Sequence, residues 1–255
     1  MGKYNGKVVI ITGAGKSGGI GYGIATAFAK EGADLVVTGR RMQPLLDAKE
    51  ELERLYGVRV LPVSADGGKE EDAKRVIAET VQEYGRIDVL INNAQNSASG
   101  VLLKDHTVAD FDRAIYSGLY ATFLLMRESY PYLKETKGSV INFASGAGLF
   151  GRTAQSSYAA AKEGIRGLSR VAATEWGPDG INVNIVCPLV MTDQLKAWKE
   201  AYPEAYAATI KGIPMGRMGD PEQDIGRTCV FLASEDAKFI SGETITLQGG
   251  SGLRP

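Results

Sequence analysis

Residues 7–23 read Lys7-Val-Val-Ile-Ile-Thr12-Gly-Ala-Gly-Lys-Ser-Gly-Gly-Ile-Gly21-Tyr-Gly23, an apolar run of strand length that passes directly into a glycine-rich turn. Glycines at such a turn let the backbone approach a pyrophosphate closely, and the following helix presents its N-terminal amides to the negative charge. A flexible Gly/Ser loop is the alternative, but a glycine turn between a first strand and a first helix favours a dinucleotide site. The candidate phosphate-loop residues are Gly13, Gly15, Lys16, Ser17, Gly19, Ile20 and Gly21.

Apolar runs and helical stretches alternate along the whole chain. After the first run at 7–12, runs of strand length follow at 34–38, 58–63, 87–91, 139–144, 181–186 and 244–247. Helical stretches are expected near 20–31, 45–56, 69–84 and 155–176, with another that ends near Leu133. This alternation indicates crossover units around a parallel sheet. It predicts an α/β, Rossmann-like, doubly wound, mainly parallel seven-stranded sheet with helices on both faces, in a single domain over residues 1–255.

Composition and charge narrow the class of function. The chain has 255 residues and a formal net charge of −1, which gives no basic field for a nucleic-acid partner. No stretch is long and apolar enough to span a membrane, and no signal peptide is expected. The two cysteines, Cys187 and Cys229, are expected to be reduced thiols, so the predicted location is the cytoplasm. His106 is the only histidine, so neither a histidine triad nor a metal site is expected.

The end of the second strand bears on the choice of dinucleotide. An NAD site usually carries an acidic side chain there, whereas the 2′-phosphate of NADP needs a cation. The sequence at this edge is Val36-Val-Thr-Gly-Arg40-Arg41, with two arginines and no acid. Because a guanidinium suits phosphate, we expect NADP, with Arg40 as the main contact and Arg41 and Lys16 as helpers. The alternative is that these are solvated surface charges.

A Tyr and a Lys four residues apart, in Tyr158-Ala-Ala-Ala-Lys162, form the main candidate for chemistry. On a helix these side chains share a face, so both can meet one cofactor and one substrate. A phenol is a poor base near neutral pH unless a cation stabilises the phenolate, and Lys162 can supply that cation. Ser145, at the end of an apolar run, can hold the reacting oxygen beside the phenol. Taken alone, the Tyr-Lys spacing is common in proteins of any function.

In this order, the strand, glycine turn, Asn92-Asn-Ala94, Ser145 and the Tyr158/Lys162 pair resemble the short-chain dehydrogenase/reductase family. The resemblance covers nearly the whole chain. It implies that Tyr158 is the general acid/base, that Lys162 lowers its pKa and binds the nicotinamide ribose, and that Ser145 orients the reacting oxygen.

The same resemblance implies further cofactor contacts. Asp66 would meet the adenine, Asn92 would steady the central strand beside the cofactor with Ala94 next to it, and Pro188 and Thr192 would approach the nicotinamide amide. A homotetramer is also implied.

Four positions depart from the family's pattern. Gly19-Ile-Gly21 arrives two residues late after Thr12-Gly13, which predicts a longer phosphate loop, and Gln95 and Leu189 stand where glycine is usual. Gly118 occupies the place of an asparagine that often supports a water relay to the lysine. Either the proton path then runs through waters held by backbone carbonyls, or the activity has been lost. Retention of Ser145, Tyr158 and Lys162 favours the first explanation.

The segment at about 190–217 is expected to form a lid over the nicotinamide. Its apolar residues recur at three- and four-residue spacing, which places them on one helical face: Leu195, Trp198, Tyr202, Tyr206 and Ile210. Such a lid suits a bulky apolar substrate, although ordinary packing is the alternative. The predicted substrate contacts are Gln95, Ser145, Leu189, Leu195, Trp198 and Tyr202. Lys196, Lys199, Lys211 and Arg217 are candidates to meet a substrate carboxylate.

Within the family, residues 19–25, 92–95 and 116–122 are most similar to bacterial bile-acid hydroxysteroid dehydrogenases of the NADP-dependent 12α type. The resemblance implies reversible oxidation of the 12α-hydroxyl of a bile acid to the 12-ketone. Other steroid positions and a 3-oxoacyl thioester or ketone reductase, with the same Ser145, Tyr158 and Lys162, are alternatives. A non-catalytic dinucleotide-binding sensor is a second alternative, motivated by Gly118.

Overall fold

Seven strands form one sheet in the order β3-β2-β1-β4-β5-β6-β7, and every pairing in it is parallel. The computed structural model describes residues 2–16 and 18–252, so the predicted loop residue Ser17 lies outside the described residues. The strands are β1 (Val8–Thr12), β2 (Asp34–Gly39), β3 (Val60–Ser64), β4 (Val89–Asn92), β5 (Ser139–Phe143), β6 (Asn182–Pro188) and β7 (Thr244–Leu247). The predicted fold class is confirmed, and the sheet is wholly rather than mainly parallel.

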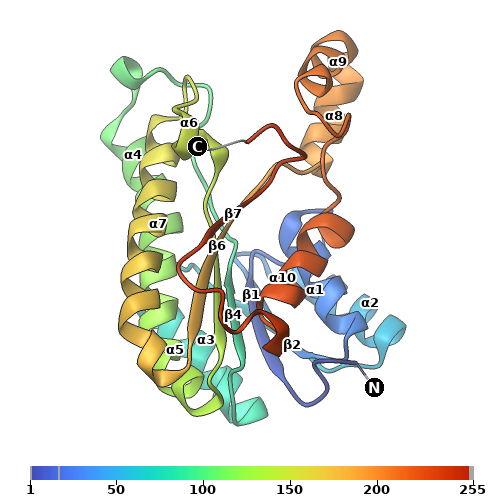
Figure 1. The fold of residues 1–255 in the computed structure, drawn as a ribbon, viewed down its shortest axis with the longest axis vertical. Helices are drawn as coiled ribbons and strands as arrows, with labels where there is room; N and C mark the ends of the chain where they lie inside the picture. Colours follow the sequence, from blue (N-terminus) through green and yellow to red (C-terminus); the bar gives the residue numbers. More distant parts are fainter. Residues whose placement is uncertain (1, 17, 253–255) are drawn as a thin grey trace.

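Helices cover both faces of this sheet (Figure 1). One face carries α1 (Ile20–Lys30), α2 (Met42–Tyr56) and α10 (Arg227–Leu232), and the other carries α3 (Glu70–Tyr84), α5 (Ala121–Thr136) and α7 (Ser156–Trp176). Strand β1 shows how the sequence builds both layers. Val9 and Ile11 pack in the core under α1 and α2, whereas Val8 and Ile10 pack under α3 and α5. Because alternate side chains point to opposite faces, a continuous apolar run fills two cores.

The connections reverse direction at the middle of the sheet. From β1 the chain crosses to β2 and β3 on one side, and it returns to place β4 on the other side of β1. In open parallel sheets, ligands bind at such a switch point, in the crevice outside the carboxyl ends of the strands. The fold therefore positions the glycine turn after β1 beside the Asn-Asn-Ala segment after β4.

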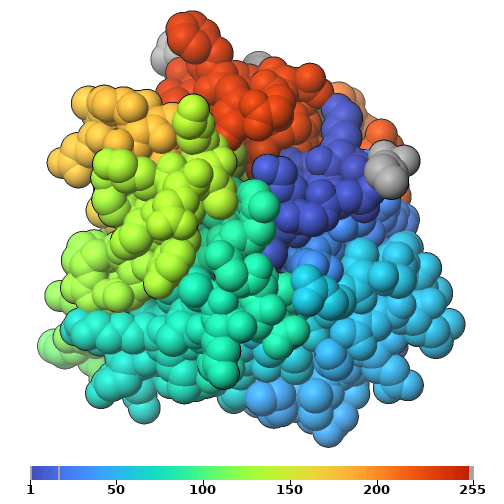
Figure 2. Space-filling view, turned by 90° about the horizontal axis from the view of Figure 1, so that it is seen from below, coloured from blue at the N-terminus to red at the C-terminus, as the bar shows by residue number. Residues whose placement is uncertain are grey.

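Shorter elements surround this edge of the sheet. They are α4 (Val108–Ala114), a π-helical turn (Ile115–Tyr120), α6 (Gly146–Phe150), α8 (Asp193–Ala201) and α9 (Pro203–Lys211). In Figure 1, α8 and α9 project beyond the sheet at the same end as α4 and α6. Figure 2 views the molecule from the opposite end, where N-terminal (blue), central (green) and C-terminal (red) segments lie against one another.

The lid differs from its prediction in one respect. The expected single helical face over 195–210 is wrong, because α8 ends at Ala201 and α9 begins at Pro203. Proline has no N–H for a helical hydrogen bond, and its ring disfavours a helical conformation of the preceding residue. The break leaves Trp198 on α8 in edge contact with Tyr206 on α9, with ring centroids 6.2 Å apart. Across residues 2–16 and 18–252, no helix is long and apolar enough to cross a membrane.

Candidate active site

The glycine-rich turn leaves room for a ligand because side chains are absent where the backbone doubles back. Gly13 has a φ of 69°, a conformation that favours glycine. A Cβ on Gly21 would collide with the carbonyl oxygen of Gly13, so only glycine allows this approach. Helix α1 then begins at Ile20, and its first amide groups face the turn without any side-chain cap. Free amides at a helix start suit a pyrophosphate.

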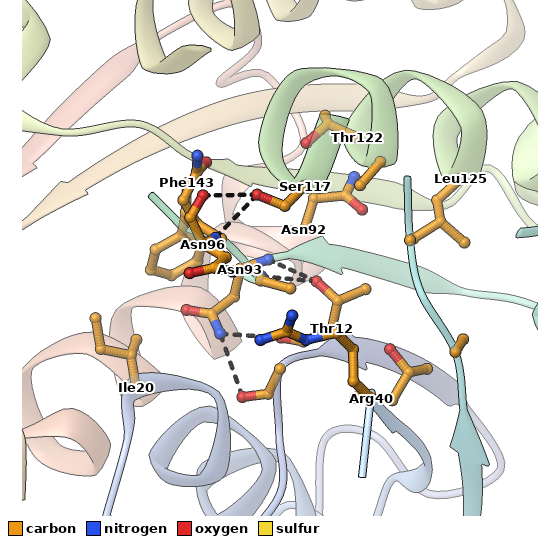
Figure 3. Close-up of a pocket in the computed structure, with 18 of the residues that line it drawn as sticks. Thr12, Ile20, Arg40, Asn92, Asn93, Asn96, Ser117, Thr122, Leu125 and Phe143 are labelled. Atoms are coloured by element: carbon orange, nitrogen blue, oxygen red, sulfur yellow. Dashed lines mark hydrogen bonds between the residues drawn. The ribbon is translucent and has the colours of Figure 1, made fainter. Parts of the chain in front are cut away.

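Hydrogen bonds tie this turn to the end of β4 (Figure 3). The hydroxyl of Thr12 accepts hydrogen bonds from the backbone amides of Asn93 and Ala94, both at 2.9 Å. The side-chain amide of Asn93 donates back to the Thr12 carbonyl oxygen at 2.9 Å. These bonds fix the carboxyl ends of β1 and β4 relative to each other, so the crevice between them is preformed.

A cavity of about 520 Å³ occupies this crevice and is lined by residues from both halves of the chain. Its volume falls within the range of ordinary ligand pockets. Ten of the predicted cofactor residues line it: Gly13, Ile20, Arg40, Asp66, Asn92, Ala94, Tyr158, Lys162, Pro188 and Thr192. The predicted residues Gly15, Lys16, Gly19, Gly21 and Arg41 do not line it.

At the β2 end of this cavity, the structure distinguishes the two arginines. Arg40 lines the cavity and Arg41 is exposed outside it (Figure 3). Lys16 forms an ion pair with Glu51 of α2, so its ammonium group is already paired with a carboxylate. Asp66 lines the cavity farther along, and its carboxylate accepts a hydrogen bond from the Gly68 amide at 3.2 Å. Arg40 is therefore the cation best placed for a phosphate at this edge.

Tyr158 and Lys162 lie one turn apart on α7 and face the same cavity. Lys162 is only 2% exposed, and its ammonium donates to the Phe143 carbonyl oxygen at 2.7 Å. The ammonium lies 5.5 Å from the centroid of the Tyr158 ring. Ser145 caps α6, where its hydroxyl accepts a hydrogen bond from the Ala147 amide at 3.1 Å, and it also hydrogen-bonds the phenol of Tyr158. The three predicted catalytic side chains therefore converge.

Burial sets the proton affinities of this group. Loss of water lowers the pKa of Lys162 to about 8. Burial also raises the pKa of Tyr158, opposed by the hydrogen bond from Ser145 and by the positive charge of Arg152. The pKa of Tyr158 is therefore raised and not lowered as expected, because desolvation outweighs the hydrogen bond from Ser145 and the charge of Arg152. A lysine that holds its proton only weakly is suited to pass it on.

A buried chain of polar side chains links β4 and β5 to α7, the helix that carries Lys162. The Asn92 amide donates to Asn142 Oδ1 at 2.8 Å, and the Asn142 amide donates to Ser169 Oγ of α7 at 2.8 Å. Asn92 Oδ1 itself is buried and has no partner in the described part of the chain. A buried acceptor of this kind calls for a donor, and it lies on the wall of the cavity. Both features fit a bound ligand or water at this wall.

Gln95 lies where the loop after β4 meets the π-helical turn. Its side-chain amide donates to the Ala114 carbonyl oxygen at 3.0 Å, while its oxygen is buried without a partner among the described residues. A Cβ on Gly118 would collide with this amide. Gln95 and Gly118 both depart from the family's pattern, and the two departures depend on each other because the Gln95 side chain fills the space beside Gly118.

Of the predicted substrate contacts, Gln95 lines the first cavity. Leu189, Leu195 and Trp198 line a second cavity of about 390 Å³ beneath the lid. The linings of the two cavities meet in the chain at the end of β6, where Pro188 lines the first cavity and Leu189 lines the second. Tyr202 is 60% exposed and lines neither cavity, so its assignment as a substrate contact is not supported. It sits at the break between α8 and α9, which turns it outward.

The lid cations proposed for a substrate carboxylate also lie elsewhere. Arg217 pairs with Asp224, Lys196 pairs with Asp193, and Lys199 stacks on the ring of Tyr206. None of the four lid cations, Lys211 included, lines the second cavity.

Several residues of the site escaped sequence reasoning. Asn93 hydrogen-bonds Thr12 across the crevice, and Asn142 hydrogen-bonds Ser169 of α7, the helix that carries Lys162. Ser117 holds the loop after β4 by a hydrogen bond to the Asn96 carbonyl oxygen (Figure 3). Thr12 and Asn93 end adjacent parallel strands, so their meeting could have been inferred from the switch point. The partners of Asn142 depend on how helices pack on the sheet, which no local pattern encodes.

Comparison with known proteins gives the family context. Residues 13–251 match the family described as enoyl-(acyl carrier protein) reductase. The chain is 66% identical, over all of both proteins, to a 12alpha-hydroxysteroid dehydrogenase from Clostridium sp. (strain ATCC 29733 / VPI C48-50). It is 34% identical to a 3-oxoacyl-[acyl-carrier-protein] reductase from Thermotoga maritima, over 97% of this chain and 98% of that protein. The crystal structure of levodione reductase superimposes with a TM-score of 0.90 at 30% identity, covering 98% of each chain.

Proposed function

Because the chain belongs to the short-chain dehydrogenase/reductase family, we propose that it uses NADP to oxidise the 12α-hydroxyl of a bile acid reversibly to the 12-ketone. As a member of this family, it is an oxidoreductase that uses a nicotinamide dinucleotide. The steroid substrate is supported by the 66% identity, over the full length, to a protein named for that reaction. The apolar cavity beneath the lid is compatible with it.

The chemistry of oxidation can be assigned to this chain's own residues. Ser145 holds the substrate oxygen beside the phenol, and Tyr158 accepts the hydroxyl proton as a general base. Lys162, with its pKa lowered to about 8, stabilises the phenolate and relays the proton. When bound, the nicotinamide supplies the hydride acceptor. Burial of the pair excludes water and strengthens these electrostatic interactions.

NADP is proposed over NAD from the charge at the end of β2. Arg40 lines the cavity, and no carboxylate pairs with its side chain in the described part of the chain. An arginine in this position can clamp a 2′-phosphate in a bidentate manner. Asp34, the acid of β2 itself, lies at the other end of the strand and pairs with Arg59.

The test is a spectrophotometric assay with purified protein. We expect NADP reduction with cholate and no comparable NADPH oxidation with 3-oxoacyl thioesters. The Tyr158→Phe variant should lose about 10²–10⁴-fold in kcat, the contribution typical of a general acid/base, and should still bind NADPH. Turnover of thioesters but of no bile acid would instead support the reductase alternative.

The sensor alternative has weaker support. Lys162 is buried at a cost to stability, since desolvation penalises its charge, and a protein that only binds a dinucleotide needs no such buried pair with Tyr158. An NADPH-binding protein with no activity that Tyr158→Phe abolishes would favour the sensor.

The proposal extends to organisation and assembly. Residues 1–255 are proposed as one domain with a lid at about 190–217, working in the cytoplasm on its NADP pool. A homotetramer is supported by apolar residues exposed on two separate areas, Phe123 and Val171 on α5 and α7, and Phe231 and Phe239 near the C-terminal end. Exposed apolar patches often mark interfaces. Sedimentation equilibrium of the purified protein would test the four-chain assembly.

A further inference from the structure

The lining of the second cavity, beneath the lid, combines apolar side chains with a positive charge. It lies between the loop after β6, both lid helices and the segment that follows α6. Its apolar lining consists of Leu189, Leu195, Trp198, Ile213 and Met218. Among the described residues, the lining contains one charged residue, Arg152, two residues after the end of α6. A cavity of this kind suits an apolar body that carries one anionic group.

The guanidinium of Arg152 is available for an anion. Among the described residues, no carboxylate lies within ion-pair distance of it, and it is exposed. Its backbone amide bonds to the Ala147 carbonyl oxygen at 3.1 Å, so the loop that carries it is anchored while the side chain is not. This contrasts with Arg217 and Lys196 of the lid, whose charges are paired with Asp224 and Asp193.

Arg152 is also a neighbour of the reacting group. Helix α6 connects Ser145, which caps it, to Arg152, and the charge of Arg152 helps to lower the pKa of the Tyr158 phenol. An anion held by Arg152 therefore lies one short helix away from Ser145. This proximity restricts which substrates can satisfy both groups at once.

We propose that Arg152 binds the acidic side chain of a steroid substrate whose rings pack against Leu195 and Trp198, and so selects a hydroxyl near that side chain. This inference rests on the proposed bile-acid function. In a bile acid, carbon 12 and carbon 17, which carries the acidic side chain, are both bonded to carbon 13. The 3-hydroxyl lies at the opposite end of the ring system. A cation beside Tyr158 thus favours oxidation at carbon 12 over carbon 3.

The experiment compares cholate with its methyl ester, the same steroid with a neutral side chain. Steady-state kinetics are measured for the wild type, Arg152→Gln and the matched control Arg227→Gln, which removes an exposed arginine of α10 that does not line the cavity. For Arg152→Gln we expect KM for cholate to rise by about 10-fold or more, as for loss of a charge-assisted hydrogen bond. KM for the methyl ester should stay within about twofold of the wild type. Arg227→Gln should match the wild type on both substrates.

Two results would overturn the role of Arg152. One is an equal effect of Arg152→Gln on cholate and its ester, because a general effect on the phenol or on the fold does not distinguish the two side chains. The other is wild-type protein that prefers the ester to the acid.

A binding measurement separates this inference from the proposed function. Calorimetric titration of the NADPH-bound protein with cholate and with its ester requires no turnover. Tighter binding of cholate, lost in Arg152→Gln, supports the anion site even if no bile acid is oxidised. Equal affinity of the wild type for acid and ester rejects the site even if cholate is a substrate.

Discussion

The side-chain amide of Gln95 occupies the space that a side chain at Gly118 would need, since a Cβ on Gly118 would lie inside contact distance of the Gln95 amide. Gly118 is buried in a π-helical turn, and Gln95 is held over it by the hydrogen bond to the Ala114 carbonyl oxygen. The Gln95 side chain can take this position only because residue 118 is a glycine. The family's asparagine could not be accommodated at Gly118 while Gln95 keeps this position.

This relationship predicts a conditional effect on stability. Gly118→Ala should lower the free energy of unfolding by about 1–3 kcal/mol, because the new methyl group displaces a buried, hydrogen-bonded amide. In a Gln95→Gly background the same substitution should be nearly neutral or stabilising. Urea denaturation of the four proteins measures the coupling.

Gly167→Ala provides the matched control. Gly167 is exposed on α7, and a Cβ there would meet nothing within 4 Å. We expect a gain of about 0.5–1 kcal/mol from helix propensity alone. Equal effects of Gly118→Ala with and without Gln95 would show that the two residues are independent.

The cofactor preference should depend on Arg40. Arg40→Ala removes the cation that lines the cavity at the end of β2, so the Kd for NADP should rise about 10- to 100-fold with little change for NAD. Fluorescence titration with both dinucleotides measures this. Arg41→Ala is the control, because Arg41 lies outside the cavity and should have a smaller effect. An unchanged ratio of NADP to NAD affinity in Arg40→Ala would remove the basis for proposing NADP.

Replacing Lys162 should raise the stability of the fold and lower the activity of the enzyme. The lysine is buried with its pKa lowered from 10.5 to about 8, so holding its charge in the fold costs free energy at neutral pH. Lys162→Met should abolish turnover and raise the free energy of unfolding at pH 7 by about 1–2 kcal/mol, after the lost bond to the Phe143 carbonyl is allowed for.

The pH dependence of this gain has a defined sign. Between pH 8 and 10.5 the folded wild type releases the Lys162 proton while the unfolded chain retains it, so wild-type stability rises through this window. Because wild-type stability rises by about 1.4 kcal/mol per pH unit in this window, the advantage of Lys162→Met should shrink from pH 8 upward and be lost before pH 10.5. Denaturation curves at pH 7, 9 and 10.5 would check the trend. An advantage that is constant with pH would mean that the charge of Lys162 is not the cause.

The lid makes a prediction about substrate size. Trp198 lines the cavity beneath α8, so Trp198→Ala should raise KM for a steroid by about 10-fold or more through lost apolar contact. Tyr202→Ala should leave KM unchanged, because Tyr202 is exposed at the break between α8 and α9. Initial-rate kinetics with cholate distinguish the two. A larger effect at Tyr202 than at Trp198 would contradict this arrangement of the lid.

The class of fold and the main residues of the site could be predicted from the amino-acid sequence. Alternating apolar runs and helical stretches fixed the parallel sheet, because backbone geometry and burial impose their periods locally. The glycine turn after β1 and the Tyr158/Lys162 pair were also local, since each lies within one turn or one helix. Arg40 followed from its place at the end of β2.

Contacts between side chains far apart in the sequence could be read from the folded chain alone. The tertiary structure placed Tyr202 outside the cavity beneath the lid, placed Arg152 in the lining of that cavity, and joined Gln95 to Gly118. It also showed that burial, rather than Lys162, dominates the proton affinity of Tyr158 in the protein alone. These outcomes depend on desolvation and on packing between segments far apart in the chain, and neither is encoded in the spacing of residues within one segment.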